Sequence, residues 1–358
     1  MRIGIVTQPL EMNYGGILQN WALQQALKSL GHKPLTIDAY QRLSTPHYVF
    51  NYLRANIMRG FGKWYAEPRR YRGAMRSEIT GRFIEENIDK TRVLWDYKQS
   101  IVRRYHMDAL IVGSDQVWRQ AYCGDHLEDM YLRFSSGLPV RRIAYAASFG
   151  VDKWDYTPEQ TAACSALVKQ MDAVSVREES GVEMCREHLG VDAEWVLDPT
   201  MLLTSNQYEP IIDHEWSYTE PYLAVYCLTI NPEKEAFFKK LADDRGLKVL
   251  YFSSGWSSEV TIEQWLAILK NASMVVTDSF HGTVFSILFG KEFYTLCTLH
   301  RGITRISSLL TRLSLEHRLI LDNALTEPSM RDIDWPTVHD RLEGLREESL
   351  SFLRKALE

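Results

Sequence analysis

The stretch VVTDSFHGTVFSILFGKEF, residues 275–293, places polar side chains between two apolar runs. Such a pattern predicts a buried strand that ends at Asp278 and Ser279, followed by a buried helix that begins beside His281. The amide groups and dipole at the start of a helix favour an anion. We therefore expect His281 to act as an acid or base beside a bound anion; a capping or hydrogen-bonded structural role is the alternative.

Two further residues are candidates for holding an anion. Gly282 has no side chain, so the backbone there can approach a phosphate or carboxylate closely, or the glycine can simply relieve crowding. Arg177, in SVREES, directly follows another predicted strand. Its guanidinium can bind a carboxylate or phosphate through two parallel hydrogen bonds, and an ion pair with Glu178 or another acid is the alternative.

Two loops nearer the N-terminus carry side chains suited to a sugar. In GSDQVW, Asp115 can accept hydrogen bonds from a sugar hydroxyl or act as a base, and Trp118 can stack on a ring. Capping of the next turn is the alternative for Asp115. The NYGG loop follows the first strand but is not GxGxxG, which excludes a nicotinamide site. The candidates that these two loops offer are Asn13, Tyr14, Gln116 and Trp118, with Asp115 as the base.

Strands, loops and helices alternate along the chain and must position these residues. RIGIVT, the helix from residue 17 and PLTIDAY form a βαβ unit, and DALIV, RRIAYAA and DAVSV continue the pattern. A second series starts near Pro221. Loops at the carboxyl ends of parallel strands line one sheet edge, where ligands bind. The sequence thus predicts an α/β fold with two doubly wound domains facing each other across a cleft.

We place the first domain at residues 1–205; it includes a helical, basic insertion at about 48–107. The second domain spans 206–335. Residues 336–358 form one amphipathic helix, whose apolar face either forms a dimer or covers the core.

The composition excludes several classes of protein. The 358 residues are 45% apolar and 24% charged, as in ordinary globular proteins, and the net charge of −5 argues against nucleic-acid binding. Five scattered cysteines give neither a disulfide framework nor a zinc motif and suit a reducing compartment. We find no signal peptide, no spanning segment, no Walker sequence and no HExxH motif, and therefore expect a cytoplasmic protein without metal or cofactor.

One basic stretch, residues 54–76, interleaves Arg and Lys with aromatic side chains. It is interpreted as a solvated helical insertion. The alternative is contact with an anionic glycan, a lipid-linked substrate or a membrane surface, which would make the protein peripheral at the inner face of the membrane.

Six motifs in order, NYGGILQNWAL, VGSDQVW, YAASFG, SVREESG, VLDPTMLL and TDSFHGTVFSILFGKEF, resemble the polysaccharide pyruvyltransferase family over residues 1 to about 320. The resemblance implies two Rossmann-like domains in a glycosyltransferase-B-like arrangement. It further implies that phosphoenolpyruvate is the donor and a hexose of a cell-surface polysaccharide, or of its lipid-linked precursor, is the acceptor. The product would be a pyruvate ketal on two hydroxyls, formed with loss of phosphate and without a metal for donor binding.

By the same resemblance, His281 matches the functional histidine of the family and Arg177 matches a donor-binding arginine. Many members carry an arginine two residues before the histidine, whereas this chain has Ser279. Ser279 and Gly282 are kept as donor-binding candidates. The resemblance makes the second domain the donor side and the first domain the acceptor side, with Asn13, Tyr14, Gln116 and Trp118 as acceptor-binding candidates. Arg301 or Arg305 can replace the missing cation, and we predict Arg305.

Two other functions stay open. One is a glycosyltransferase that uses a nucleotide sugar. The other is a non-catalytic glycan-binding protein of a polysaccharide assembly complex, which the missing arginine favours. A homo-oligomer is compatible with each of the three functions.

Overall fold

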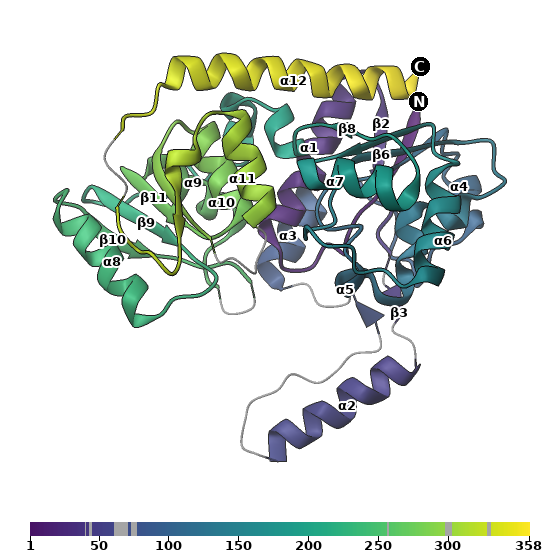
Figure 1. Cartoon of the computed structure of the whole chain (residues 1–358), viewed down its shortest axis with the longest axis horizontal. Helices are drawn as coiled ribbons and strands as arrows, with labels where there is room; N and C mark the ends of the chain where they lie inside the picture. The colour runs from purple at the N-terminus through teal and green to yellow at the C-terminus, as the bar shows by residue number, and fades with distance from the viewer. Residues whose placement is uncertain are drawn as a thin grey trace.

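Two parallel β-sheets, each flanked by helices, make up two Rossmann-like domains (Figure 1). The computed structural model describes residues 1–39, 41–42, 45–60, 71–72, 77–255, 258–297, 303–327 and 331–358. The predicted fold class, two α/β domains that face each other, is confirmed.

The first sheet has the strand order β2-β1-β5-β6-β7-β8, and all its pairings are parallel. Its strands are β1 Arg2–Val6, β2 Lys33–Thr36, β5 Ala109–Val112, β6 Arg141–Ala147, β7 Ala173–Val176 and β8 Glu194–Trp195. The main helices around it are α1 Tyr14–Ser29, α6 Pro158–Val168 and α7 Glu179–Met184.

Both faces of this sheet are buried. Along β5, Ala109 and Ile111 join one apolar core, whereas Leu110 and Val112 join another. Successive side chains of a strand point to opposite faces, so a strand covered on both sides is apolar throughout. The unbroken apolar run ALIV therefore already indicated a central parallel strand.

The second sheet has the order β10-β9-β11-β12-β13, again fully parallel. Its strands are β9 Tyr222–Tyr226, β10 Lys248–Tyr251, β11 Met274–Thr277, β12 Glu292–Cys297 and β13 Leu319–Leu321. Its helices are α8 Pro232–Asp243, α9 Ile262–Asn271, α10 Phe280–Leu288 and α11 Ile303–Arg312. The Asn-Pro start predicted for α8 is confirmed, because Asn231 Oδ1 accepts a hydrogen bond from Lys234 N at 2.9 Å.

The predicted insertion at 48–107 is helical, but only its first part stands apart from the domain. Helix α2 Thr45–Gly60 and the short antiparallel pair β3 Gln41–Arg42 and β4 Tyr71–Arg72 lie outside both main sheets. In contrast, α3 Glu78–Asn87 is packed into the domain, where Phe83 and Ile84 are fully buried.

The segment after α3 also belongs to the domain. Parallel bridges join Thr36 to Lys90 and Ala39 to Leu94 beside the first sheet. Helices α4 Gln99–Arg104 and α5 Gln120–Cys123 follow. The insertion boundary expected at residue 107 is therefore wrong, since apolar residues from 83 onward contribute to the core.

The two domains share one apolar core at their boundary. It contains Tyr14, Ile17 and Trp21 of α1 together with Trp265 of α9 and Phe285 of α10. Because the facing helices bury these large side chains against each other, the relative position of the two domains is fixed by packing as well as by the connecting chain.

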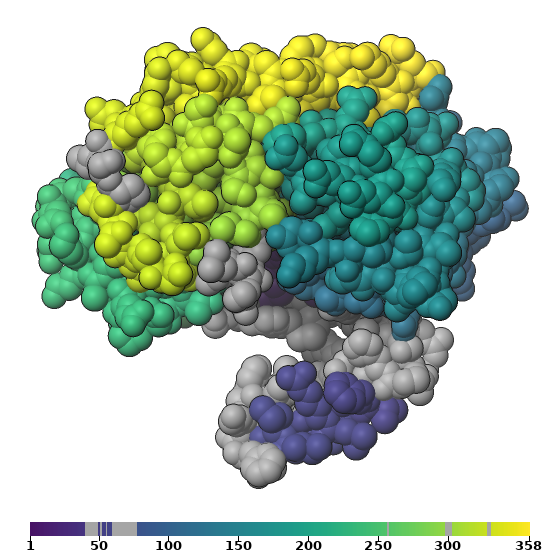
Figure 2. Space-filling view, in the orientation of Figure 1, coloured from purple at the N-terminus to yellow at the C-terminus, as the bar shows by residue number. Residues whose placement is uncertain are grey.

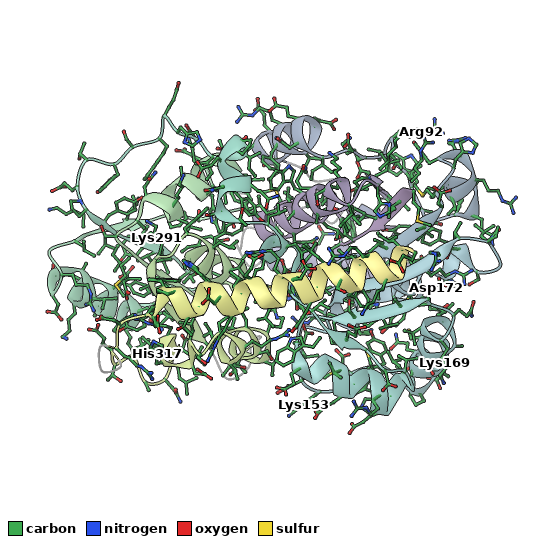
Figure 3. All side chains as sticks on the ribbon, turned by 90° about the horizontal axis from the view of Figure 1, so that it is seen from above. Arg92, Lys153, Lys169, Asp172, Lys291 and His317 are labelled. Atoms are coloured by element: carbon green, nitrogen blue, oxygen red, sulfur yellow. The ribbon has the colours of Figure 1, made fainter. Side chains whose placement is uncertain are left out.

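Helix α12, Trp335–Leu357, spans both domains (Figures 1 and 3). Its first half contributes Val338 and Leu342 to the boundary core, and its last turns contribute Phe352 and Leu353 to a core that contains Ile3. The structure shows that this apolar face covers the core, which is one of the two roles expected for it. Within the described residues, no helix combines the length and apolar character needed to cross a bilayer.

Candidate active site

His281 occupies the second position of α10, directly after the end of β11, as the sequence predicted. Ser279 is the N-cap of this helix, and its Oγ accepts a hydrogen bond from Gly282 N at 3.4 Å. The Gly282 amide is therefore already used, and its missing side chain leaves room for Thr277 rather than for a ligand. His281 is only 6% exposed, and its Nε2 has no hydrogen-bond partner among the described residues.

The imidazole of His281 lies at the boundary between the domains. A Cβ built on Gly15 of α1 would overlap the ring. Only glycine permits this approach of the α1 backbone, so the first glycine of the NYGG motif explains how a histidine of the second domain reaches the first.

Asp198 faces His281 from the first domain, with 3.8 Å between Asp198 Oδ2 and His281 Nε2. Asp198 caps the 3-10 helix η5, Pro199–Leu202, and its Oδ1 accepts hydrogen bonds from Thr200 N and Oγ1 at 3.0 and 2.6 Å. Its Oδ2 accepts hydrogen bonds from Ser114 Oγ at 2.8 Å and Arg177 Nη1 at 2.7 Å.

Asp198 is held in its charged form. Burial by itself raises the pKa of this carboxyl group, but the neighbouring His281 and Arg177 side chains and the hydrogen bond from Thr200 Oγ1 outweigh burial and hold the pKa well below its usual range. A charged Asp198 therefore faces the imidazole of His281 across the domain boundary.

Arg177 follows β7 as predicted, but its guanidinium is engaged by protein carboxylates. The side chain is fully buried, and Nη1 and Nη2 lie 2.7 and 3.3 Å from Asp198 and Asp115. Burial lowers the pKa of Arg177, but Asp198, Asp115 and Glu178 outweigh burial and raise the pKa above its ordinary value. The ion-pair alternative is thus what the structure contains. Arg177 organises the carboxylates and is not exposed for a bidentate contact with a ligand.

Asp115 and Asn13 lie together, as the assignment of both to one side of the site requires. Asn13 Nδ2 donates to Asp115 Oδ2 over 3.1 Å, and Asp115 has a backbone φ of 70°, which is uncommon outside glycine. A cavity of about 40 Å³ lies beside them at the carboxyl ends of β1 and β5; its lining residues are Thr7, Gln8, Pro9, Leu10, Asn13, Gly16, Ile17 and Asp115.

Arg305 of α11 supplies a cation next to the start of α10. Its Cζ lies 5.9 Å from the centroid of the Phe280 ring, and Arg177 Cζ lies 4.6 Å from the same ring. Burial and then repulsion from Arg177 lower the pKa of Arg305. Its buried Nε makes no hydrogen bond among the described residues. Arg301, the other candidate for this role, lies outside the described residues.

Two acceptor-side candidates have structural roles instead. Trp118 is fully buried and stacks on Tyr131, with ring centroids 4.7 Å apart and planes 5° apart, so its proposed stacking on a sugar is wrong. Tyr14 is buried, and its hydroxyl donates to Val260 O over 2.5 Å, which joins the two domains. Neither ring faces a space that a sugar could enter.

Gln116 is partly exposed, but its side chain is occupied. Its Oε1 accepts a hydrogen bond from Arg119 Nη1 at 2.6 Å, and its backbone oxygen accepts one from Gln8 Nε2 at 3.0 Å. The residue lies next to Asp115 in the loop after β5, so it remains near the predicted acceptor side.

Sequence reasoning missed the roles of Asp198 and Ser114, and it named Glu178 only as a possible ion-pair partner of Arg177. Glu178 is fully buried, and its Oε1 accepts hydrogen bonds from Ser148 Oγ at 2.9 Å and Phe149 N at 2.8 Å. The available signal for Asp198 was its place in VLDPTMLL, just beyond a short strand and before a proline. Each of the three lies just after a strand of the first sheet, where ligand-facing residues are expected.

A separate group of metal-ligating types lies away from this site. Asp96, His126 and Asp129 have donor atoms within 4.8 Å of one another. Asp129 Oδ2 is 3.3 Å from His126 Nδ1, and its Oδ1 accepts from Arg133 Nη2 at 3.1 Å. This network is complete as a hydrogen-bonded cluster, and Arg133 already supplies the positive charge that a cation would bring.

The comparison with solved structures finds matches of low sequence identity. UDP-N-acetylglucosamine 2-epimerase from Rickettsia bellii matches with a TM-score of 0.49 and 9% identity over 99% of this chain and 96% of its own. The corresponding epimerase from Methanocaldococcus jannaschii has a TM-score of 0.45 and 12% identity over 97% and 93%. The Streptomyces sp. SF2575 glycosyltransferase SsfS6 has a TM-score of 0.42 and 14% identity over 98% and 96%.

None of the curated protein sequences matches the chain. The sequence profile of polysaccharide pyruvyl transferase matches residues 13–296 of the 358. The match begins at Asn13 and includes Asp115, Arg177, Asp198 and His281, the residues that meet at the domain boundary. The chain therefore belongs to the polysaccharide pyruvyl transferase family and is a transferase.

Proposed function

We propose that the protein transfers the pyruvyl group of phosphoenolpyruvate to two hydroxyls of one hexose in a polysaccharide or its lipid-linked precursor. One observation carries the proposal. His281 and Arg305 flank the start of α10, and each has a buried nitrogen, Nε2 and Nε respectively, that lacks a hydrogen-bond partner among the described residues. Buried polar atoms without partners are uncommon in native proteins and favour a ligand at this place.

Phosphoenolpyruvate carries a phosphate and a carboxylate, so its site needs fixed positive charge. Arg305 and the amide end of α10 provide it, because the helix dipole and the guanidinium attract the same anion. Arg177 contributes only indirectly, since its charge is compensated by Asp198 and Asp115. We thus assign to Arg305 the role of the arginine that many family members carry at the position of Ser279.

The reaction assigns His281 to proton transfer. A proton is added to the methylene carbon of phosphoenolpyruvate, and the first sugar hydroxyl attacks the neighbouring carbon, losing its own proton. Phosphate then leaves with its electron pair, and the second hydroxyl attacks the same carbon and loses its proton. The two hydroxyls lose two protons in total. One replaces the proton that was added to the methylene carbon, and the other is taken up by the released phosphate. His281 holds the proton that is delivered to the donor.

Asp115 is the base proposed for the sugar hydroxyls. It faces the small cavity together with Asn13, and its carboxylate oxygens are oriented by Arg177 and Asn13. Asp198 is a positioning residue. Its carboxylate is fixed by Ser114, Arg177 and Thr200 and lies 3.8 Å from Nε2 of the imidazole that transfers the proton.

The proposal is tested by calorimetric titration of phosphoenolpyruvate, with and without methyl hexosides, followed by phosphate-release assays. We expect Arg305→Met to weaken donor binding by about tenfold or more, equivalent to at least ~1.4 kcal/mol. Arg312→Met is the matched control, because Arg312 lies on the same helix but contacts Trp195 and Glu348. It should leave donor affinity unchanged.

His281→Ala separates binding from chemistry. We expect phosphate release to fall by about 10² or more, the usual contribution of an acid or base, with the donor still bound. Saturable binding of a nucleotide diphosphate in place of phosphoenolpyruvate would support the nucleotide-sugar transferase instead. Glycan binding without turnover, unaffected by His281→Ala, would support the non-catalytic alternative.

A further inference from the structure

Helix α2 projects from the first domain, below the two domains in Figures 1 and 2. Its described side chains include three large apolar residues that face solvent: Phe50 is 63% exposed, Leu53 is 55% exposed and Ile57 is 59% exposed. Water-exposed side chains of this kind, gathered on one element, commonly mark an interaction surface.

The three side chains lie on one face of the helix. Their positions i, i+3 and i+7 recur at helical spacing, so Phe50, Leu53 and Ile57 form one apolar stripe. Arg54 borders the stripe, and the sequence of the helix, residues 45–60, contains no acidic residue. The helix thus combines an apolar stripe with positive charge, the pattern of a helix that lies in a membrane interface.

The sequence around α2 is strongly basic. Residues 54–76 include seven Lys or Arg and one acidic residue, Glu67, although the whole chain has a net charge of −5. In the sequence, the positive charge is therefore concentrated in α2 and the residues that follow it, and it complements an anionic partner.

We propose that α2 forms a docking surface for a bilayer that contains anionic phospholipids. The stripe of Phe50, Leu53 and Ile57 inserts among the acyl chains near the headgroups, and Arg54 contacts the phosphates. A second copy of the chain does not fit as the occupant, because α2 contains no acidic residue that could oppose the arginines of another α2 in a symmetric contact. The proposal goes beyond the transferase activity and does not depend on the donor.

The test is sedimentation of the full-length protein with vesicles of phosphatidylcholine alone or mixed with phosphatidylglycerol. We expect binding to the anionic vesicles only, and we expect it to weaken as salt is raised, because salt screens the headgroup charges. The double variant Phe50→Ser/Ile57→Ser should bind at least about tenfold more weakly. Its fold should be unaffected, which thermal unfolding checks, because both side chains are exposed.

The matched control is Leu228→Ser/Tyr251→Ser, which removes two comparably exposed apolar side chains from the second domain. Its vesicle binding should equal that of the wild type. Absence of binding by the folded wild type, or equal binding by both double variants, would overturn the proposal. So would a wild-type dimer that Phe50→Ser/Ile57→Ser converts to a monomer without any vesicle binding, since α2 would then be a self-association surface. Phosphoenolpyruvate titrations on the same samples keep failure of the donor assignment separate.

Discussion

Gly15 in the first domain lies directly against the imidazole of His281 in the second domain. A methyl group at this position would overlap the ring, so Gly15→Ala must move either the histidine or the start of α1. We expect phosphate release to fall by at least about tenfold, because the proton donor is displaced from the reacting carbon. Steady-state kinetics and thermal unfolding of the variant measure the two consequences.

The control for that change is Gly344→Ala on α12. A Cβ at Gly344 meets no atom within 4 Å, so the substitution adds only helix propensity. It should stabilise the protein by up to about 1 kcal/mol and leave kcat unchanged. Equal activity of Gly15→Ala and Gly344→Ala would contradict the role assigned to the Gly15 contact.

Asp198→Asn should destabilise the protein and inactivate it. The substitution leaves Arg177 buried with less compensating charge, and removing one partner of a buried ion pair costs about 3–5 kcal/mol. Urea unfolding gives the free energy, and a cycle with Arg177→Met isolates the interaction between the two side chains. The exposed pair Arg186 and Asp192 offers the control, because Asp192→Asn should cost less than about 1 kcal/mol. If Asp198→Asn lowered the free energy of unfolding no more than Asp192→Asn does, the buried pair would contribute little to stability.

Local sequence was sufficient to find His281 but not Asp198. Strand β11, the cap Ser279 and helix α10 are contiguous, so their pattern in residues 274–288 placed the histidine at a helix start. Asp198 acts through Ser114, Arg177 and His281, which lie on other loops and in two domains. Its neighbours follow from tertiary packing, and a short strand followed by Asp-Pro reads equally well as an ordinary cap.

Tyr14→Phe should loosen the contact between the domains. The variant removes one of the two hydrogen bonds to Val260 O and leaves only the longer one from Ser258 Oγ at 3.3 Å, and the net contribution of a hydrogen bond is about 0.5–1.5 kcal/mol. We expect lower unfolding free energy and faster limited proteolysis at the domain boundary. Tyr218→Phe, at an exposed ring, should change stability by less than about 0.5 kcal/mol. Identical proteolysis of wild type and Tyr14→Phe would rule out this hydrogen bond as a tie between domains.

Stability should fall in alkaline solution. Burial raises the pKa of the Cys164, Cys185 and Cys297 thiols to about 12, whereas free thiols titrate near 8.5. The unfolded chain therefore loses these protons first, so stability is full below about pH 8 and decreases as pH rises towards about 12. Urea unfolding at about pH 8 and about pH 10.5 should differ by several kcal/mol, since each group contributes about 1.4 kcal/mol per pH unit in this range. Constant stability over this range would mean that the thiols are accessible in the native state.

Trp118 was misassigned for a similar reason, because the residues that bury it lie outside its own sequence segment. Trp118 follows the polar loop after β5, and its neighbours in sequence suggested an exposed ring. It is covered by Tyr131 and hydrogen-bonded to Met130 O, from irregular 3-10 turns that leave no periodic signal. The fold itself was predictable because both sheets are built from short apolar runs of β type separated by helices, which is information held within each segment.

The path of α12 has a consequence for synthesis on the ribosome. Phe352 and Leu353 complete the core that contains Ile3, and they are translated only after the whole second domain. The apolar face of the first domain that Phe352 and Leu353 cover therefore stays exposed to solvent until these two residues have been synthesised. Docking of α12 is expected to be a late step of folding, and chains that stall before residue 352 should be substrates for chaperones.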